Sequence, residues 1–144
     1  MAWSPTTRNL FTGVNRPLDG RNLTDLERMH MPAIEAPAHV HAGEPFQVRV
    51  RIGYPSLHPS ERSHFIGTID LCADELVLAR ADLRGGNALP DVVFRACLTE
   101  PVTELQVRGQ CNLHGTWGGS VALHVETGRQ ESSGSPTAAP RRCT

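Results

Sequence analysis

The segment Phe46–Ile52 constrains the fold most strongly, because apolar and polar side chains alternate along its whole length. Alternation with a period of two predicts a β-strand that turns one face to a core and the other to water. The apolar face of this strand carries Phe46, Val48, Val50 and Ile52. Turn-forming triplets bound the segment, Gly43-Glu44-Pro45 before it and Gly53-Tyr54-Pro55 after it. The chain therefore contains a half-buried strand with its arginines in water.

Six other short segments have strand character, and turn residues separate them. They are Met31–Ala36, Phe65–Cys72, Leu76–Asp82, Asp91–Leu98, Glu104–Arg108 and Ser120–Glu126. Ala73-Asp74-Glu75 predicts a hairpin between the second and third of these segments. A short helix is expected near Leu23–Met29, with Asp19 or Asn22 as its N-cap. About seven short antiparallel strands, without a long helical pattern, predict an all-β sandwich.

The 144 residues suffice for one domain with a hydrophobic core of its own. We expect an irregular N-terminal arm over residues 1–26, because Pro, Gly, Asn and Thr are scattered there without periodicity. The β-sandwich domain is expected over residues 27–126. Residues 127–144 lack core-forming side chains, which predicts a disordered tail.

Charge and hydropathy exclude several classes of partner. The 14 basic and 15 acidic residues give a net charge of −1, so no nucleic acid or membrane partner is expected. No apolar run approaches the roughly 18 residues of a spanning helix, and Met1–Gly13 lacks the apolar region of a secretory signal. The expected location is therefore cytoplasmic. All basic residues are arginine, which excludes Schiff-base and P-loop lysine mechanisms.

The four cysteines are widely spaced and contain no Cys-x-x-Cys pair, which excludes a rubredoxin-like iron site and an all-cysteine zinc ribbon. Reduced thiols are expected. Cys72 and Cys97 are interpreted as small packing residues in strands, with a bridge between them left open, and Cys143 as a free thiol in the tail. His39, His41 and His124 lie in strand-like segments and are expected to face solvent.

Five other residues are candidate metal ligands. His30 precedes the first predicted strand, and His58 and His64 share one loop between strands. Cys111 and His114 form a Cys-x-x-His unit, whose two intervening residues let both side chains turn toward one ion. Each motif alone is a weak signal, but their conjunction in the loops of one sandwich predicts a single metal site.

The segments around these residues resemble the superoxide reductases of the desulfoferrodoxin/neelaredoxin family. They occur in the order of the family and lie within residues 27–126. Their sequences are His30-Met31-Pro32-Ala33-Ile34-Glu35, Ala42-Gly43-Glu44-Pro45-Phe46, His58-Pro59 with His64-Phe65-Ile66, and Cys111-Asn112-Leu113-His114-Gly115-Thr116-Trp117. The resemblance is to the single-iron type, because Met1–Glu27 contains no cysteine for a second, four-cysteine iron centre.

The resemblance implies an immunoglobulin-like β-sandwich with one mononuclear non-haem iron, Fe2+ or Fe3+, per chain. The implied equatorial ligands are His30, His58, His64 and His114, with the Cys111 thiolate axial and the sixth position open for superoxide. The implied reaction is one-electron reduction of superoxide to hydrogen peroxide, with a rubredoxin-like or other small electron donor. Family members are dimers or tetramers, so a homo-oligomer is expected. The alternative is a non-catalytic metal-binding or electron-transfer module.

The chain departs from the family just before the first ligand, where a Glu-Lys pair is usual. Arg28 and Met29 stand there in direct alignment, whereas a slip of one residue places Glu27 and Arg28 on the pair. Arg28 and Arg62 are the candidates for the positive charge that attracts superoxide. Glu61 is a candidate mobile carboxylate, with an exposed loop residue as the equal alternative. Glu35 and Glu61 are also candidate partners that orient ligand imidazoles.

Overall fold

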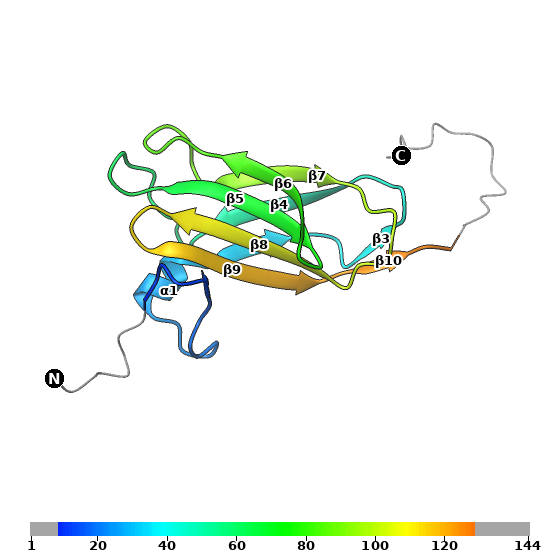
Figure 1. The fold of residues 1–144 in the computed structure, drawn as a ribbon, viewed down its shortest axis with the longest axis horizontal. Helices are drawn as coiled ribbons and strands as arrows, with labels where there is room; N and C mark the ends of the chain where they lie inside the picture. The colour runs from blue at the N-terminus through cyan, green and yellow to red at the C-terminus, as the bar shows by residue number, and fades with distance from the viewer. Residues whose placement is uncertain (1–8, 129–144) are drawn as a thin grey trace.

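The computed structural model describes residues 9–128 and confirms the predicted all-β sandwich. One sheet has the order β1-β9-β8-β5-β6 and the facing sheet the order β2-β4-β7 (Figure 1). The first consists of β1 (Val14–Asn15), β9 (Gly115–Ala122), β8 (Glu104–Cys111), β5 (Ile66–Ala73) and β6 (Leu76–Asp82). The second consists of β2 (Pro32–Glu35), β4 (Phe46–Ile52) and β7 (Asp91–Ala96). A small third pair joins β3 (His39–His41) to β10 (His124–Glu126).

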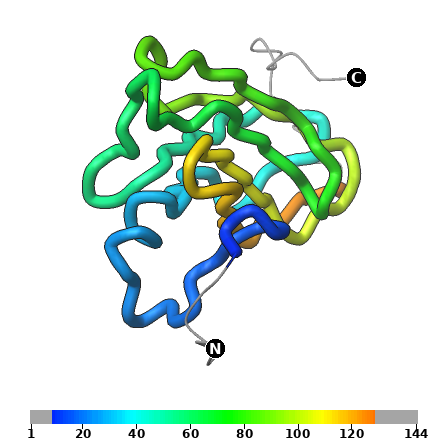
Figure 2. The backbone as a smooth tube through the Cα atoms, turned by 60° about the vertical axis from the view of Figure 1, so that its left-hand side comes forward, coloured from blue at the N-terminus to red at the C-terminus, as the bar shows by residue number. Residues whose placement is uncertain are grey.

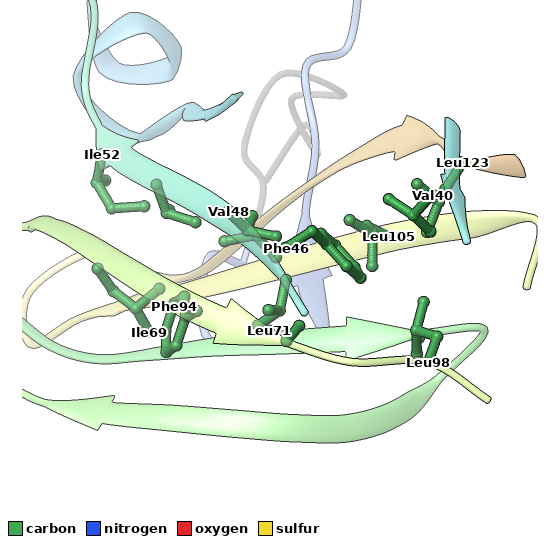
Figure 3. Packing of buried hydrophobic residues seen from close by; sticks show 14 of the residues in the cluster. Val40, Phe46, Val48, Ile52, Ile69, Leu71, Phe94, Leu98, Leu105 and Leu123 are labelled. Atoms are coloured by element: carbon green, nitrogen blue, oxygen red, sulfur yellow. The ribbon is translucent and has the colours of Figure 1, made fainter. Parts of the chain in front are cut away.

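The core lies between the two sheets and is built on the alternation that the sequence shows. Every apolar residue of β4 is buried, and its polar residues between them are exposed or half-buried. Strand β4 is central in its sheet, antiparallel to both neighbours. Its side chains meet those of the facing sheet, including Ile69, Leu71 and Leu105 (Figure 3). Burial of this face supplies the main free energy that holds the sheets together.

Two strand pairs differ from the antiparallel prediction: β1 pairs with β9, and β3 with β10, in parallel. The predicted strand Ser120–Glu126 is also divided, because Leu123 separates the end of β9 from β10 and donates its N–H to Thr103 O at 3.0 Å. Strand β9 begins at Gly115, five residues before the prediction. Gly118 in this strand allows β1 to pack closely, since a Cβ there would lie 2.6 Å from Val14.

A short helix, α1 (Asp25–His30), precedes β2, and its N-cap is Thr24. Thr24 Oγ1 accepts the Glu27 N–H at 3.1 Å, and Glu27 Oε1 accepts the Thr24 N–H at 2.9 Å. The expectation of Asp19 or Asn22 as N-cap is therefore wrong. These two residues form a turn instead, in which Asp19 O accepts the Asn22 N–H at 3.2 Å.

The described part of the N-terminal arm lies with α1 at one end of the sandwich (Figures 1 and 2). Asn15 fastens it there, donating through Nδ2 to Leu10 O at 2.6 Å and to Thr116 O at 2.9 Å. Within residues 9–128, no helix is long and apolar enough to cross a bilayer. The predicted tail falls outside the described residues from position 129 onward, and so does Cys143.

Candidate metal centre

The five predicted ligands come together at the end of the sandwich where α1 lies. His30 is the last residue of α1, and Cys111 is the last residue of β8. His58 and His64 lie in the loop from β4 to β5, and His114 lies in the turn between β8 and β9. Separate segments of the chain thus deliver their donor groups to one point.

The four imidazoles form a closed circuit. Ring centroids of successive neighbours lie 4.7 Å apart for His30–His58, 4.4 Å for His58–His64, 5.0 Å for His64–His114 and 4.9 Å for His30–His114. Across the circuit, His30 and His64 are 6.3 Å apart. Neighbouring ring planes are inclined by 64–77°. The rings therefore surround a common centre instead of stacking on one another.

The sulfur of Cys111 contacts two corners of this circuit. Its Sγ lies 3.5 Å from His58 Nε2 and 3.6 Å from His114 Nδ1. The donor atoms of Cys111, His30, His58 and His64 all lie within 4.8 Å of one another. The sulfur also accepts hydrogen bonds from the backbone N–H groups of Leu113 and His114. One thiol and four imidazoles thus face a shared space.

Backbone carbonyls fix the orientation of two ligand rings. His30 Nδ1 lies 2.7 Å from Leu26 O, and His58 Nδ1 lies 2.8 Å from Pro59 O. Because a carbonyl oxygen only accepts, each Nδ1 carries the proton and each Nε2 presents a lone pair to the centre. The expected orienting partner Glu35 lies elsewhere, since it pairs with Arg51 on the exposed side of β2 and β4.

Two buried nitrogens show that the centre fits a metal ion. Nε2 of His30 and Nε2 of His64 are buried and have no hydrogen-bond partner. A buried polar atom without a partner costs free energy, so such atoms are rare in folded proteins. A cation between the rings would satisfy both nitrogens. Imidazole and thiolate donors suit a transition metal, whereas calcium and magnesium prefer oxygen.

Burial sets the protonation state of the donors in the metal-free chain. It lowers the pKa of His30 and of His58 from 6.5 to about 4, and it also lowers the pKa of His114. These imidazoles are therefore neutral at pH 7, the form that binds metal. Burial raises the pKa of the Cys111 thiol, against the two N–H groups that favour the thiolate. Binding of an ion must therefore displace the thiol proton.

The four charged residues predicted near the ligands have different surroundings. Glu27 is buried, and its carboxylate accepts the N–H groups of Thr24 and Leu18, both at 2.9 Å. These contacts hold the helix that presents His30.

Arg28 is exposed and pairs with Asp25 at 3.3 Å. Glu61 and Arg62 are exposed in the turn that leads to His64, where the Glu61 N–H donates to His64 O at 2.8 Å.

Trp117 forms one wall of the centre. Its buried ring stacks on His30 with a centroid distance of 5.2 Å and an interplanar angle of 24°. Its Nε1 donates to His114 O at 2.9 Å. Trp117 thereby holds two ligand segments in place.

The sequence analysis missed Asn112, which links two ligand loops. Its Oδ1 accepts the Phe65 N–H at 2.9 Å, and its Nδ2 donates to Ser63 O at 3.0 Å. The side chain thus holds the backbone on both sides of His64. Its place between the two donors of the Cys-x-x-His unit is the signal that would have indicated a positioning role.

Replacing Asn112 with alanine is expected to weaken metal binding at the centre about 10–100-fold, the range typical of residues that orient metal ligands. The domain should still fold, because the side chain is exposed at the end of the sandwich. A chelator competition assay measures the change. Asn87→Ala, in the exposed turn after Arg84, is the matched control and should bind the metal ion as the wild type does. Equal affinity of Asn112→Ala and wild type would contradict the positioning role.

Cys72 and Cys97 differ in their bonding, because one is a free thiol and the other is in a disulfide. Cys72 is a free, buried thiol 3.1 Å from Arg108 Nη2, so the bridge to Cys97 that the sequence left open is not formed. Cys97 is disulfide-bonded, so the expectation of reduced thiols is wrong for this residue.

Comparison with known proteins places this centre in a family. The family model for desulfoferrodoxin matches residues 22–120, which include all five residues of the centre. The chain belongs to the desulfoferrodoxin family. The predicted family is thereby confirmed, and with it the assignment as a superoxide reductase, an oxidoreductase.

Individual desulfoferrodoxin-family relatives cover most of the chain. A Methanocaldococcus jannaschii protein assigned to the superoxide reductases is 37% identical over 110 residues, 74% of this chain and 90% of that protein. The solved superoxide reductase (neelaredoxin) from Ignicoccus hospitalis is 38% identical, with a TM-score of 0.60 over 67% of this chain and 81% of that one. A one-iron superoxide reductase from Giardia intestinalis is 29% identical, with a TM-score of 0.56 over 67% of this chain and 99% of that one.

Proposed function

We propose that this superoxide reductase holds one mononuclear iron and reduces superoxide to hydrogen peroxide there. The proposed ligands are His30, His58, His64, His114 and Cys111. The closed circuit of four imidazoles, with the Cys111 sulfur against two of its corners, is the observation that carries this proposal. Five donors exceed the four of a structural zinc site. Borderline nitrogen donors with one soft thiolate suit ferrous iron.

The reaction consumes one superoxide, one electron and two protons and yields one hydrogen peroxide. Iron would supply the electron by changing between Fe2+ and Fe3+, and a small donor such as rubredoxin would restore it. The chain needs no large substrate cavity for this reaction. Its own task is to hold the donor set and to favour arrival of the anion.

Specific residues of the chain tune the donor set. Deprotonated Cys111 donates electron density from sulfur, as axial thiolates do in haem enzymes. The N–H groups of Leu113 and His114 stabilise its negative charge. Trp117 and the carbonyls of Leu26 and Pro59 keep the rings in the orientation that aims nitrogen lone pairs inward. Arginine is a poor proton donor, so we propose that water delivers the protons.

Metal analysis together with the visible spectrum tests the iron proposal. The expected result is one iron per chain and, after oxidation, a charge-transfer band from thiolate sulfur to ferric iron. Zinc without such a band would favour the non-catalytic metal-binding module. Two tightly bound irons per chain would contradict the single-iron assignment.

Arginine steering of superoxide gives a kinetic prediction. Superoxide is an anion and the net charge of the chain is −1, so local positive charge must attract it. Arg28→Glu and Arg62→Glu are expected to lower the second-order capture rate by about tenfold, the lower end of measured steering effects. The wild-type rate should fall as salt rises, because ions screen exposed charges. Pulse radiolysis of the reduced protein at several ionic strengths measures both effects.

The control for arginine steering is Arg95→Glu. Arg95 is exposed on β7 at the end of the sandwich opposite the centre, opposite Gln47 of β4. This variant makes the same change in net charge and should leave the rate nearly unchanged. A wild-type rate independent of salt, with all three variants equally fast, would contradict steering. The identity of the donor and assembly into dimers or tetramers stay predictions from the family resemblance, and a cytoplasmic location stays a prediction from the sequence.

A further inference from the structure

A second group of histidines lies at the end of the sandwich opposite the metal centre, on strands β3 and β10 (Figure 1). The two strands pair in parallel, with His124 beside His39 and Glu126 beside His41. Alternate residues of a strand share a face, so all four side chains point to the same side. The seven histidines of the chain thus divide into four at the metal centre and three here.

The scaffold beneath this histidine–glutamate face is buried and well connected. Val40 and Val125, between the polar residues, turn inward and belong to the hydrophobic core. Figure 3 shows Val40 packing near Leu123 at that end of the core. Backbone hydrogen bonds extend the pairing, from His124 N–H to Ala38 O at 2.9 Å and from Ala42 N–H to Glu126 O at 2.8 Å. The four polar side chains therefore project from a defined backbone.

Three of these side chains converge on one point. The donor atoms of His39, His124 and Glu126 all lie within 4.8 Å of one another. The two rings are 5.5 Å apart and inclined by 67°, so they meet edge to face. His41 Nδ1 lies 3.3 Å from Glu126 Oε2 and helps to hold the carboxylate in place. This is the arrangement of two imidazoles and one oriented carboxylate that transition metals favour.

We propose that His39, His124 and Glu126 form a second, surface metal site for a divalent transition ion such as Zn2+. Imidazole nitrogen and carboxylate oxygen are zinc donors, and three protein donors leave a position for water. His41 is a positioning residue for Glu126. The site lies on the exposed face, so exchange with ions in solution is direct. It takes no part in superoxide reduction.

Calorimetric titration of the iron-loaded, full-length chain with Zn2+ tests the proposal. We expect one zinc per chain in addition to iron, while the visible band of the iron centre stays unchanged. The double variant His39→Ala/His124→Ala should weaken zinc binding by about 100-fold or more, beyond the effect of losing an orienting residue. Glu126→Gln removes a charged donor with little change of shape and should weaken it about 10–100-fold. His41→Ala should have a smaller effect.

The matched control is Glu44→Ala, which removes an exposed carboxylate just after β3 and should bind zinc as the wild type does. Copper(II) provides a second measurement, because nitrogen hyperfine coupling from two imidazoles should appear in its EPR spectrum and vanish in the double variant. Absence of a second ion in the wild type would overturn the proposal. Unchanged zinc binding in both His39→Ala/His124→Ala and Glu126→Gln would overturn it as well.

Discussion

Replacement of Cys111 with serine is expected to abolish the charge-transfer band and to slow superoxide turnover about 100-fold or more, beyond the 10–100-fold loss typical of removing a residue that only orients a metal ligand. The Cys111 side chain is buried and contacts the nitrogens of His58 and His114. Serine replaces a soft, anionic sulfur with a neutral oxygen that donates far less electron density. Visible spectroscopy of the oxidised protein and stopped-flow kinetics of the reduced protein measure the two effects.

The matched control for this substitution is Cys72→Ser. Cys72 is also a free, buried thiol, but it lies in the interior of β5 and contacts Arg108. This variant should keep the charge-transfer band and the rate of superoxide turnover of the wild type, even if the folded protein is less stable. An unchanged oxidised spectrum in Cys111→Ser would show that the sulfur is not a ligand.

Acid is expected to destabilise the metal-free protein between pH 6.5 and pH 4. In the folded chain burial lowers the pKa of His30 and of His58 to about 4, whereas the unfolded chain keeps the ordinary value of 6.5. Between these values the unfolded state binds more protons, so the free energy of unfolding falls as the pH falls. Each unit of pKa difference corresponds to about 1.4 kcal/mol, so the two residues together give a loss of several kcal/mol.

Urea unfolding of the metal-free chain at several pH values measures this loss. The stability that neutral His30 and His58 contribute should be fully present above pH 6.5 and lost by pH 4. Below pH 4 the free energy of unfolding should change little through these two residues. His30→Gln removes one of the buried groups whose pKa is lowered and should flatten the profile, whereas Asn87→Ala, at an exposed residue without an ionisable side chain, should leave its shape unchanged. Iron should also dissociate in this range, because protons compete for the same nitrogens. A flat profile for the wild type would contradict the buried, neutral state of the two rings.

The centre was predictable from sequence because its donors occur in short motifs. Cys111 and His114 are three residues apart, and His58 and His64 share one loop, so local spacing already indicates chelation. The alternation in β4 likewise predicted which side chains form the core. The backbone carbonyls that orient His30 and His58 were not predictable, because every residue has a carbonyl and only the folded chain selects one.

The elements that the sequence analysis missed are short or have ambiguous composition. Strands β1 and β3 contain two and three residues, too few to show a period. Thr24, Asp19 and Asn22 are all good N-cap residues, and only the capping box with Glu27 distinguishes Thr24. His39 and His124 lie side by side because two distant segments of the chain pair in parallel, and local sequence patterns do not reveal such pairing.

Product analysis tests the central claim most directly. The iron-loaded, reduced protein is mixed with a limiting amount of superoxide, and hydrogen peroxide and dioxygen are measured together. Reduction at the five-donor centre predicts one peroxide for each superoxide consumed, with no dioxygen released and with oxidation of an equal amount of iron. Release of dioxygen in an amount equal to the peroxide would show dismutation and would contradict the account, as would failure to consume superoxide at all.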